Sequence, residues 1–153
     1  MKRTTYLLGW FVIAALLFSC LGKKNANQAT EEPLVVMDEM VTKMAKDWHS
    51  WNLNDWENFF ITFMEVADVF LESNPSKNDF YIYRGIRENM RLTIGVVHAI
   101  SEKTKTEDAK KHSEMIRQAL ENTTKHPSYE KLGKKLAAKE NELLDKYASE
   151  DLK

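Results

Sequence analysis

A helical repeat of apolar side chains is the feature that most constrains the fold of this chain. Between residues 55 and 72, aromatic and aliphatic side chains recur at spacings of three and four residues. The members of this repeat are Trp56, Phe59, Phe60, Phe63, Met64, Ala67, Phe70 and Leu71. They share one broad face of a helix, and a helix this apolar belongs at the centre of a bundle.

The same period continues on both sides and predicts an all-α bundle of four to five helices. The helices are expected at residues 34–48, 55–72, 77–103, 107–122 and 127–148. Asn54, with Glu57 three residues later, is the expected N-cap of the second helix. Ser76 and Asp79 have the same spacing at the third helix, and Thr106 precedes the fourth.

Composition narrows the class of protein. The chain has 153 residues, with 22 Lys plus Arg against 23 Asp plus Glu, so its formal net charge is −1. This length suits one domain, and the first three helices, which hold most of the aromatic residues, are expected to supply most of its core. The near-zero charge argues against nucleic acid as the main partner. A single Cys excludes an internal disulfide framework and a Cys-based zinc site.

The first twenty residues have the layout of an export signal. Lys2 and Arg3 give a positive start, residues 6–18 form an apolar run, and Ser19 and Cys20 follow it. Even when it is extended by a few residues, this run makes only about 24 Å of helix, at ~1.5 Å per residue. A permanent transmembrane helix is therefore not expected, because a bilayer core is about 30 Å thick.

The segment Leu17-Phe18-Ser19-Cys20 resembles the lipobox of bacterial lipoprotein precursors. The resemblance implies that Cys20 carries acyl chains such as palmitate and that the signal peptide, residues 1–19, is removed. Leu21 stands where an Asp would retain the protein at the inner membrane, which implies the outer membrane, and the lysines that follow favour its periplasmic face. The alternatives are an ordinary signal peptide with a chance cysteine and an uncleaved anchor.

The lipidated Cys and a flexible tether are expected at residues 20–33, because this stretch has no apolar period. Thirteen such residues have a root-mean-square reach of about 20 Å. The helical domain, residues 34–153, would then stand off the lipid headgroups without leaving the membrane. This part is similar to small all-helical lipoproteins of unknown function.

Trp48, Trp51 and Trp56 form one candidate binding surface, since Trp is enriched where partners bind most strongly. Trp51 lies at the junction between the first two expected helices, where helical periodicity does not demand burial. The alternative is a core role for this cluster, in which Trp51 folds back and caps the end of the bundle.

Arg84, Arg87 and Arg91 form a basic stripe on one face of the third expected helix. Guanidinium groups suit phosphate, carboxylate or lipid headgroups, so this stripe is a second candidate site. The alternative is a salt-bridged face, in which the acidic side chains between residues 65 and 72 lie opposite. That pairing assumes that the second and third helices are antiparallel neighbours.

The sequence offers little for a metal ion or for catalysis. Asp108 and His112, and likewise His98 and Glu102, have helical ligand spacing, but neither pair repeats as the Glu-x-x-His of a di-iron bundle. No zinc or nucleophile motif is present. We expect no metal, no cofactor and no catalytic residue, while a triad assembled only in space stays open.

Taken together, these features predict a lipid-anchored, non-catalytic interaction or structural module of the cell envelope. Its expected partners are the membrane, through the N-terminal lipid, and an envelope protein. The alternative is a periplasmic carrier of a small hydrophobic or anionic ligand, and an enzyme comes third. An apolar cavity would favour the carrier, whereas a contiguous exposed apolar patch would favour the interaction module.

Overall fold

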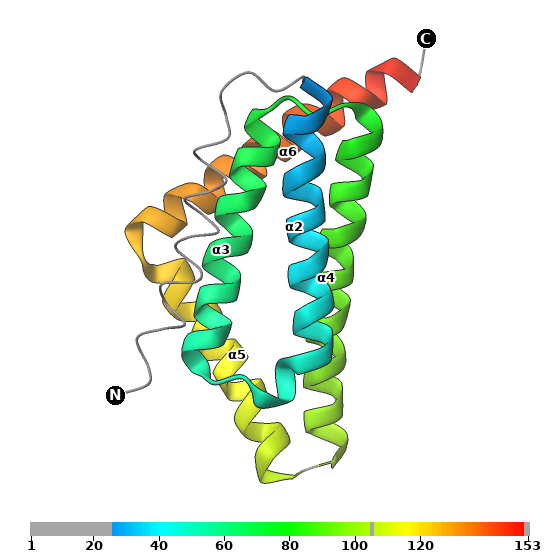
Figure 1. Ribbon diagram of the computed structural model, residues 1–153. Coiled ribbons are helices and arrows are strands. Elements are labelled where there is room, and N and C mark those ends of the chain that lie inside the picture. Colours follow the sequence, from blue (N-terminus) through cyan, green and yellow to red (C-terminus); the bar gives the residue numbers. More distant parts are fainter. Residues whose placement is uncertain (1–25, 105, 152–153) are drawn as a thin grey trace, which may run out of the picture.

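The computed structural model describes residues 26–104 and 106–151 as a bundle of helices (Figure 1). The elements are α2 (Ala26–Asp47), the short 3₁₀ helix η1 (Trp48–Ser50), α3 (Leu53–Glu72), α4 (Lys77–Thr104), α5 (Glu107–Lys125) and α6 (Pro127–Asp151). No strand occurs in these two ranges, so the prediction of an all-α bundle is confirmed. The expected signal peptide and Cys20 lie outside the described residues.

Helix α2 begins earlier than the sequence predicts. The first helix was expected to start at residue 34, but residues 26–33 already belong to α2, and Pro33 lies inside the helix. Ala, Gln and Glu are frequent in this stretch and are good helix formers, although Pro33 removes one backbone hydrogen bond. The predicted start is therefore wrong, because helix propensity continues where the apolar period stops.

Helix α3 has a capping box, but not at the predicted residues. The side chain of Asn52 accepts hydrogen bonds from the backbone nitrogens of Asn54 and Asp55, at 2.9 Å and 3.2 Å. The carboxylate of Asp55 accepts a bond from the Asn52 nitrogen at 2.8 Å. The predicted pair of Asn54 and Glu57 has the same three-residue spacing, so the sequence contains two possible capping boxes for this helix. The structure uses the earlier one, formed by Asn52 and Asp55.

The caps of the next two helices are as predicted. Ser76 precedes α4, and its hydroxyl oxygen accepts a bond from the Asp79 nitrogen at 3.2 Å. Thr106 precedes α5, and its hydroxyl oxygen accepts a bond from the Ala109 nitrogen at 3.4 Å. Each cap satisfies a backbone donor that the first helical turn leaves without an intrahelical partner.

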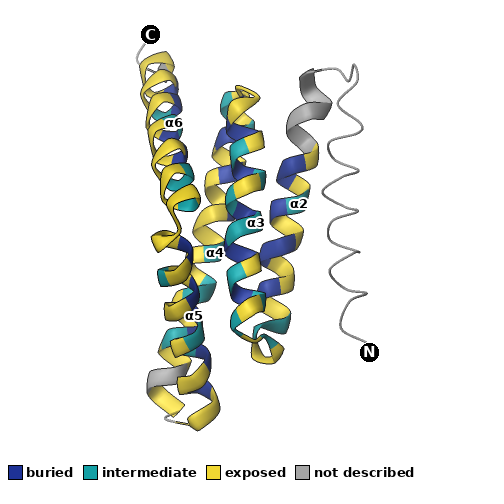
Figure 2. Ribbon diagram, turned by 90° about the vertical axis from the view of Figure 1, so that its left-hand side faces the viewer, coloured by how far each residue is buried: buried dark blue, intermediate teal, exposed yellow. Residues whose placement is uncertain are grey.

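Helices α3 and α4 run antiparallel but lie diagonally across the bundle (Figure 1). Helix α2 packs against both of them, and so does α5, while α3 also packs against α6. Helices α2, α3 and α4 occupy three corners of the bundle, and α5 and α6 together occupy the fourth. The chain bends at His126, between α5 and α6 (Figure 2). The sequence therefore predicts the direction of α3 and α4 correctly and their adjacency wrongly.

The core lies where the inner faces of these helices meet, and Figure 2 shows buried residues on those faces. Its largest fully buried side chains are Trp56, Tyr83, Phe70, Phe80, Met37, Met44, Leu71, Ile116, Leu143, Val97 and Pro75. Most of them come from α2, α3 and α4, as the uneven distribution of aromatic residues predicts. Helix α3 is the central element, because it packs against α2, α5 and α6 and carries more buried apolar side chains than any other described helix.

Candidate functional site

The tryptophan cluster occupies the end of the bundle where η1 joins α3. Trp48 and Trp51 are half-buried, whereas Trp56 is 0% exposed. The ring of Trp51 lies edge-on to that of Trp56, with centroids 4.8 Å apart, and tilts against Phe59 at 5.5 Å. This geometry favours Trp51 as a cap on the bundle end. Trp56 cannot touch a partner in this fold, so the three rings do not form one open surface.

Trp48 packs against His112 of α5, with ring centroids 5.3 Å apart and planes at 89°. His112 is buried and hydrogen-bonded to the backbone of His49, while its Nδ1 has no partner in the part of the chain that the structure describes. Burial lowers the pKa of His112, and the nearby Asp108 carboxylate opposes this shift. A neutral imidazole therefore helps to close this end of the bundle.

Asp68 and Glu72 of α3 face α6 and not the arginines of α4. Asp68 and Glu72 pair with Nζ of Lys135, at 2.8 Å and 3.1 Å. The predicted pairing of these acids with the arginine stripe is therefore wrong. The physical reason is the diagonal placement of α3 and α4, which turns this face of α3 toward a different neighbour.

The three arginines of α4 are exposed, and each has a different electrostatic environment. Arg91 pairs with Glu88 of the same helix at 2.9 Å. Arg87 pairs with Glu140 of α6. Arg84 has no carboxylate partner among the described residues. The stripe is thus a salt-bridged face at two positions and carries one unbalanced positive charge at the third.

Glu140 connects α6 to α4 through both of its carboxylate oxygens. Tyr83 donates a hydrogen bond of 2.5 Å to one oxygen, and Arg87 donates to the other. The side chain of Glu140 is 11% exposed and that of Arg87 is 53% exposed. Burial, aided by the hydrogen bond to Glu140, raises the pKa of Tyr83.

Sequence reasoning missed this network, although α6 carried a signal for it. Leu136, Glu140, Leu143 and Tyr147 recur at spacings of four, three and four residues, which is the pattern of a buried helix face. A carboxylate in such a row needs a partner, because an unpaired buried charge is costly. The pattern predicts that Glu140 is paired but not which helix supplies the pair.

A groove opens beside the arginine stripe, between α3, α4 and α5. Its volume is about 860 Å³, within the range typical of small-molecule sites. Its apolar lining consists of Phe60, Phe63, Met64, Met90, Ile94 and Leu120. Arg84, Arg87 and Arg91 line it as well.

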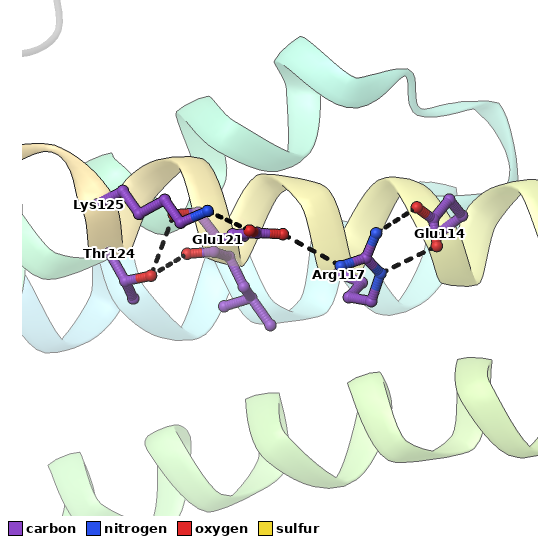
Figure 3. Close-up of polar contacts among 6 residues, drawn as sticks. Glu114, Arg117, Glu121, Thr124 and Lys125 are labelled. Carbon is purple, nitrogen blue, oxygen red and sulfur yellow. Dashed lines mark hydrogen bonds and ion pairs between the residues drawn. The ribbon is translucent and has the colours of Figure 1, made fainter.

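The outer face of α5 is covered by charged pairs (Figure 3). Arg117 lies between Glu114, at 2.5 Å, and Glu121, at 3.0 Å, and Lys125 pairs with Glu121 from the other side. All these side chains are at least 40% exposed. Exposed pairs of this kind contribute little to stability.

The two residue pairs that have metal-ligand spacing lie in the described helices α4 and α5. Within residues 26–104 and 106–151, no three His, Cys, Asp or Glu side chains gather in a way that would hold a metal ion. Nδ1 of His98 instead lies 2.5 Å from the hydroxyl oxygen of Ser113. No helix in this part of the chain has the length and hydropathy needed to cross a membrane.

Comparisons with known proteins provide no relative for this fold. No family model, no curated protein and no solved structure matches the chain. A functional assignment therefore has to come from the residues and surfaces described above.

Proposed function

We propose that this protein is a lipid-anchored, non-catalytic interaction module of the bacterial cell envelope. The resemblance of residues 17–20 to a lipobox supports an acyl anchor on Cys20. Leu21 supports placement at the outer membrane, with the helical bundle on the periplasmic side. Two or three acyl chains make a durable anchor, since each buried methylene contributes about 0.8 kcal/mol.

The observation that carries the interaction role is an apolar stripe on the outer face of α4. Leu92, Val96 and Ile100 follow one another at single helical turns and are 56%, 56% and 39% exposed. Leu92 and Val96 also line a shallow depression between α2 and α4, together with Val41 and Ala45. Contiguous exposed apolar side chains of this kind mark surfaces that bind other proteins.

The anchor is tested by Cys20→Ser. This change should abolish incorporation of a fatty-acid probe during metabolic labelling and leave the signal uncleaved. Equal labelling of the variant and the unmodified protein would overturn the anchor.

The interaction surface is tested by the double change Leu92→Ser and Val96→Ser. Both side chains are exposed, so the melting temperature should change little while chemical crosslinking to an envelope protein in intact cells is lost. Val35→Ser on α2 is the matched control, because Val35 is 55% exposed and lies outside the stripe. Crosslinking that survives the double change, or is lost equally in the control, would contradict the proposal.

A second candidate function is a carrier of a small amphiphilic ligand. The groove between α3, α4 and α5 favours it, because this groove combines an apolar lining with three arginines. Such a combination of a mostly apolar wall and a few polar groups is typical of small-molecule sites. The anchor on Cys20 and this ligand site are independent of one another and are tested separately.

A further inference from the structure

We propose that the groove between α3, α4 and α5 binds a single-chain anionic amphiphile of the fatty-acid class. Its carboxylate would lie at Arg84, and its hydrocarbon chain would lie on the apolar lining of the groove. This inference rests on the carrier function proposed above as the second candidate, and it names the ligand class.

The charges that line the groove leave one positive charge unbalanced. Glu140 balances Arg87, and Glu88, which also lines the groove, balances Arg91. Arg84 lines the groove without a carboxylate partner among the described residues. A guanidinium binds a carboxylate through two parallel hydrogen bonds. A ligand with one negative charge therefore complements this groove.

The apolar lining adds a requirement that a small inorganic anion does not meet. Phe60 and Phe63 are buried side chains of the core that reach the groove, and Met64 and Met90 are half-buried beside them. Methionine is flexible and fits apolar groups of varied shape. The lining therefore suits a hydrocarbon chain, which would remove the exposed parts of Met64 and Met90 from water when it binds.

The length of the groove supports a chain rather than a compact ligand. Its lining along α4 extends from Arg84 to Ile94, and this stretch rises about 15 Å at ~1.5 Å per residue. Arg84, which has no carboxylate partner among the described residues, lies at one end of this stretch and Ile94 at the other, while the paired Arg87 and Arg91 lie between them. The volume of about 860 Å³ accommodates one single-chain amphiphile.

One residue that lines the groove also carries a buried, unpaired hydroxyl group. Thr123 is 5% exposed and lines the groove, and its Oγ1 has no hydrogen-bond partner in the described part of the chain. An unpaired buried hydroxyl costs free energy.

The test uses the full chain in nanodiscs of zwitterionic phosphatidylcholine and a palmitic acid that carries a diazirine near the end of its chain. Illumination inserts the tail carbene into the side chains that it touches, and mass spectrometry of the digested protein locates the insertion. We expect insertion at Phe60, Phe63, Met90 and Ile94, and its suppression by unlabelled palmitate. Insertion that is absent from these residues, or spread evenly over the exposed surface, would overturn the proposal.

Variants and competitors then separate the head from the tail. Arg84→Gln should weaken palmitate binding roughly fivefold, because it removes one exposed ion pair. Arg117→Gln, on the outer face of α5, is the matched control and should leave palmitate binding unchanged. A fatty alcohol of equal length should compete less well than palmitate in the unmodified protein and equally well in Arg84→Gln. Binding that is insensitive to Arg84 would overturn the role of this residue.

Chain length distinguishes an amphiphile from a simple anion. Removal of two methylenes from the competitor should weaken it on the order of tenfold. Butyrate that competes as well as palmitate would show a simple anion site and reject the proposal. A second competitor is phosphatidylglycerol, added to the nanodisc. If it suppresses insertion as strongly as palmitate does, the groove binds a membrane headgroup, and the fatty-acid proposal is rejected.

The same digests report the anchor separately from the ligand. The mass of the N-terminal peptide shows whether Cys20 is acylated, whatever happens in the groove. An acylated Cys20 without groove insertion would overturn the ligand inference alone. Groove insertion with an unmodified Cys20 would overturn the proposed anchor alone.

Discussion

The phenolic hydroxyl of Tyr83 donates a hydrogen bond of 2.5 Å to Glu140, and this bond ties α4 to α6 across the core. Arg87 holds the second oxygen of the same carboxylate from the solvent side. A buried carboxylate is tolerated only where its oxygens are satisfied, and here two donors from one helix satisfy both of them. This network adds a polar link from α4 to α6, which also packs against α3 and α5.

Tyr83→Phe should lower the free energy of unfolding by about 1–3 kcal/mol at neutral pH, because it removes one donor and leaves an oxygen of Glu140 unsatisfied. Urea denaturation followed by circular dichroism measures this loss. Tyr81→Phe is the matched control, since Tyr81 is exposed on the same helix and should leave stability unchanged. Equal effects of the two changes would show that the buried hydrogen bond contributes nothing.

Stability should also fall at alkaline pH through Tyr83. Its pKa in the folded protein lies above the unfolded value of about 10. The contribution of Tyr83 is therefore complete below about pH 10 and is lost as the pH rises further, because the unfolded chain releases this proton first. Urea denaturation at about pH 9 and pH 11 should show a larger loss for the unmodified protein than for Tyr83→Phe. Parallel losses would contradict this assignment.

His112 should make the protein less stable in mild acid. Its folded pKa lies below the unfolded value of about 6.5, because burial disfavours the imidazolium. The stabilising contribution is present above that value and is lost as the pH falls, since the unfolded chain takes up the proton first. His112→Leu should flatten the decline in melting temperature below about pH 6.5. A His112 resonance that titrates at or above its ordinary pKa in NMR spectra would refute this prediction.

Trp51→Ala should lower the free energy of unfolding by about 2 kcal/mol, less than the loss of a fully buried ring. Trp51 packs against Trp56 and Phe59, and its removal exposes these rings to water. Thermal melting followed by circular dichroism measures the change. A nearly unchanged melting temperature, combined with loss of partner binding, would instead support the alternative in which Trp51 is a binding residue.

Phe63→Ala should cost about 3–5 kcal/mol, because Phe63 is a buried core residue of the central helix. Domains of this size are stable by only about 5–15 kcal/mol, so the melting temperature should drop sharply. Arg117→Gln provides a contrast within the same bundle. Arg117 belongs to the exposed pairs of Figure 3, and its replacement should leave the melting temperature nearly unchanged.

The helices themselves were predictable because each depends on local patterns. The apolar period of α3 and the caps at Ser76 and Thr106 involve residues within a few positions of one another. Local patterns failed where two of them competed, as at Asn52 and Asn54, and where a helix continued beyond its apolar face, as before Pro33. Both errors displace a boundary and leave the element in place.

The candidate site was predictable only in part, because it depends on which helices meet. The sequence placed the three arginines on one face of α4, but their environment is set by α3, α5 and α6. No periodicity within one helix indicates that Glu140 reaches Arg87 or that Asp68 reaches Lys135. The groove likewise combines residues from three helices and has no continuous sequence signature.

The diagonal placement of α3 and α4 also has a consequence for the order of folding. In a bundle whose consecutive helices are neighbours, each pair can form as a local hairpin, and such low contact order favours rapid folding. Here α4 packs against α5, which follows it in the sequence, and against α2, which is separated from it in the sequence by the whole of α3. Helices α3 and α4 therefore gain little by meeting each other first. Folding should consequently be slower than in a simple up-and-down bundle of the same length, and stopped-flow refolding would reveal this difference.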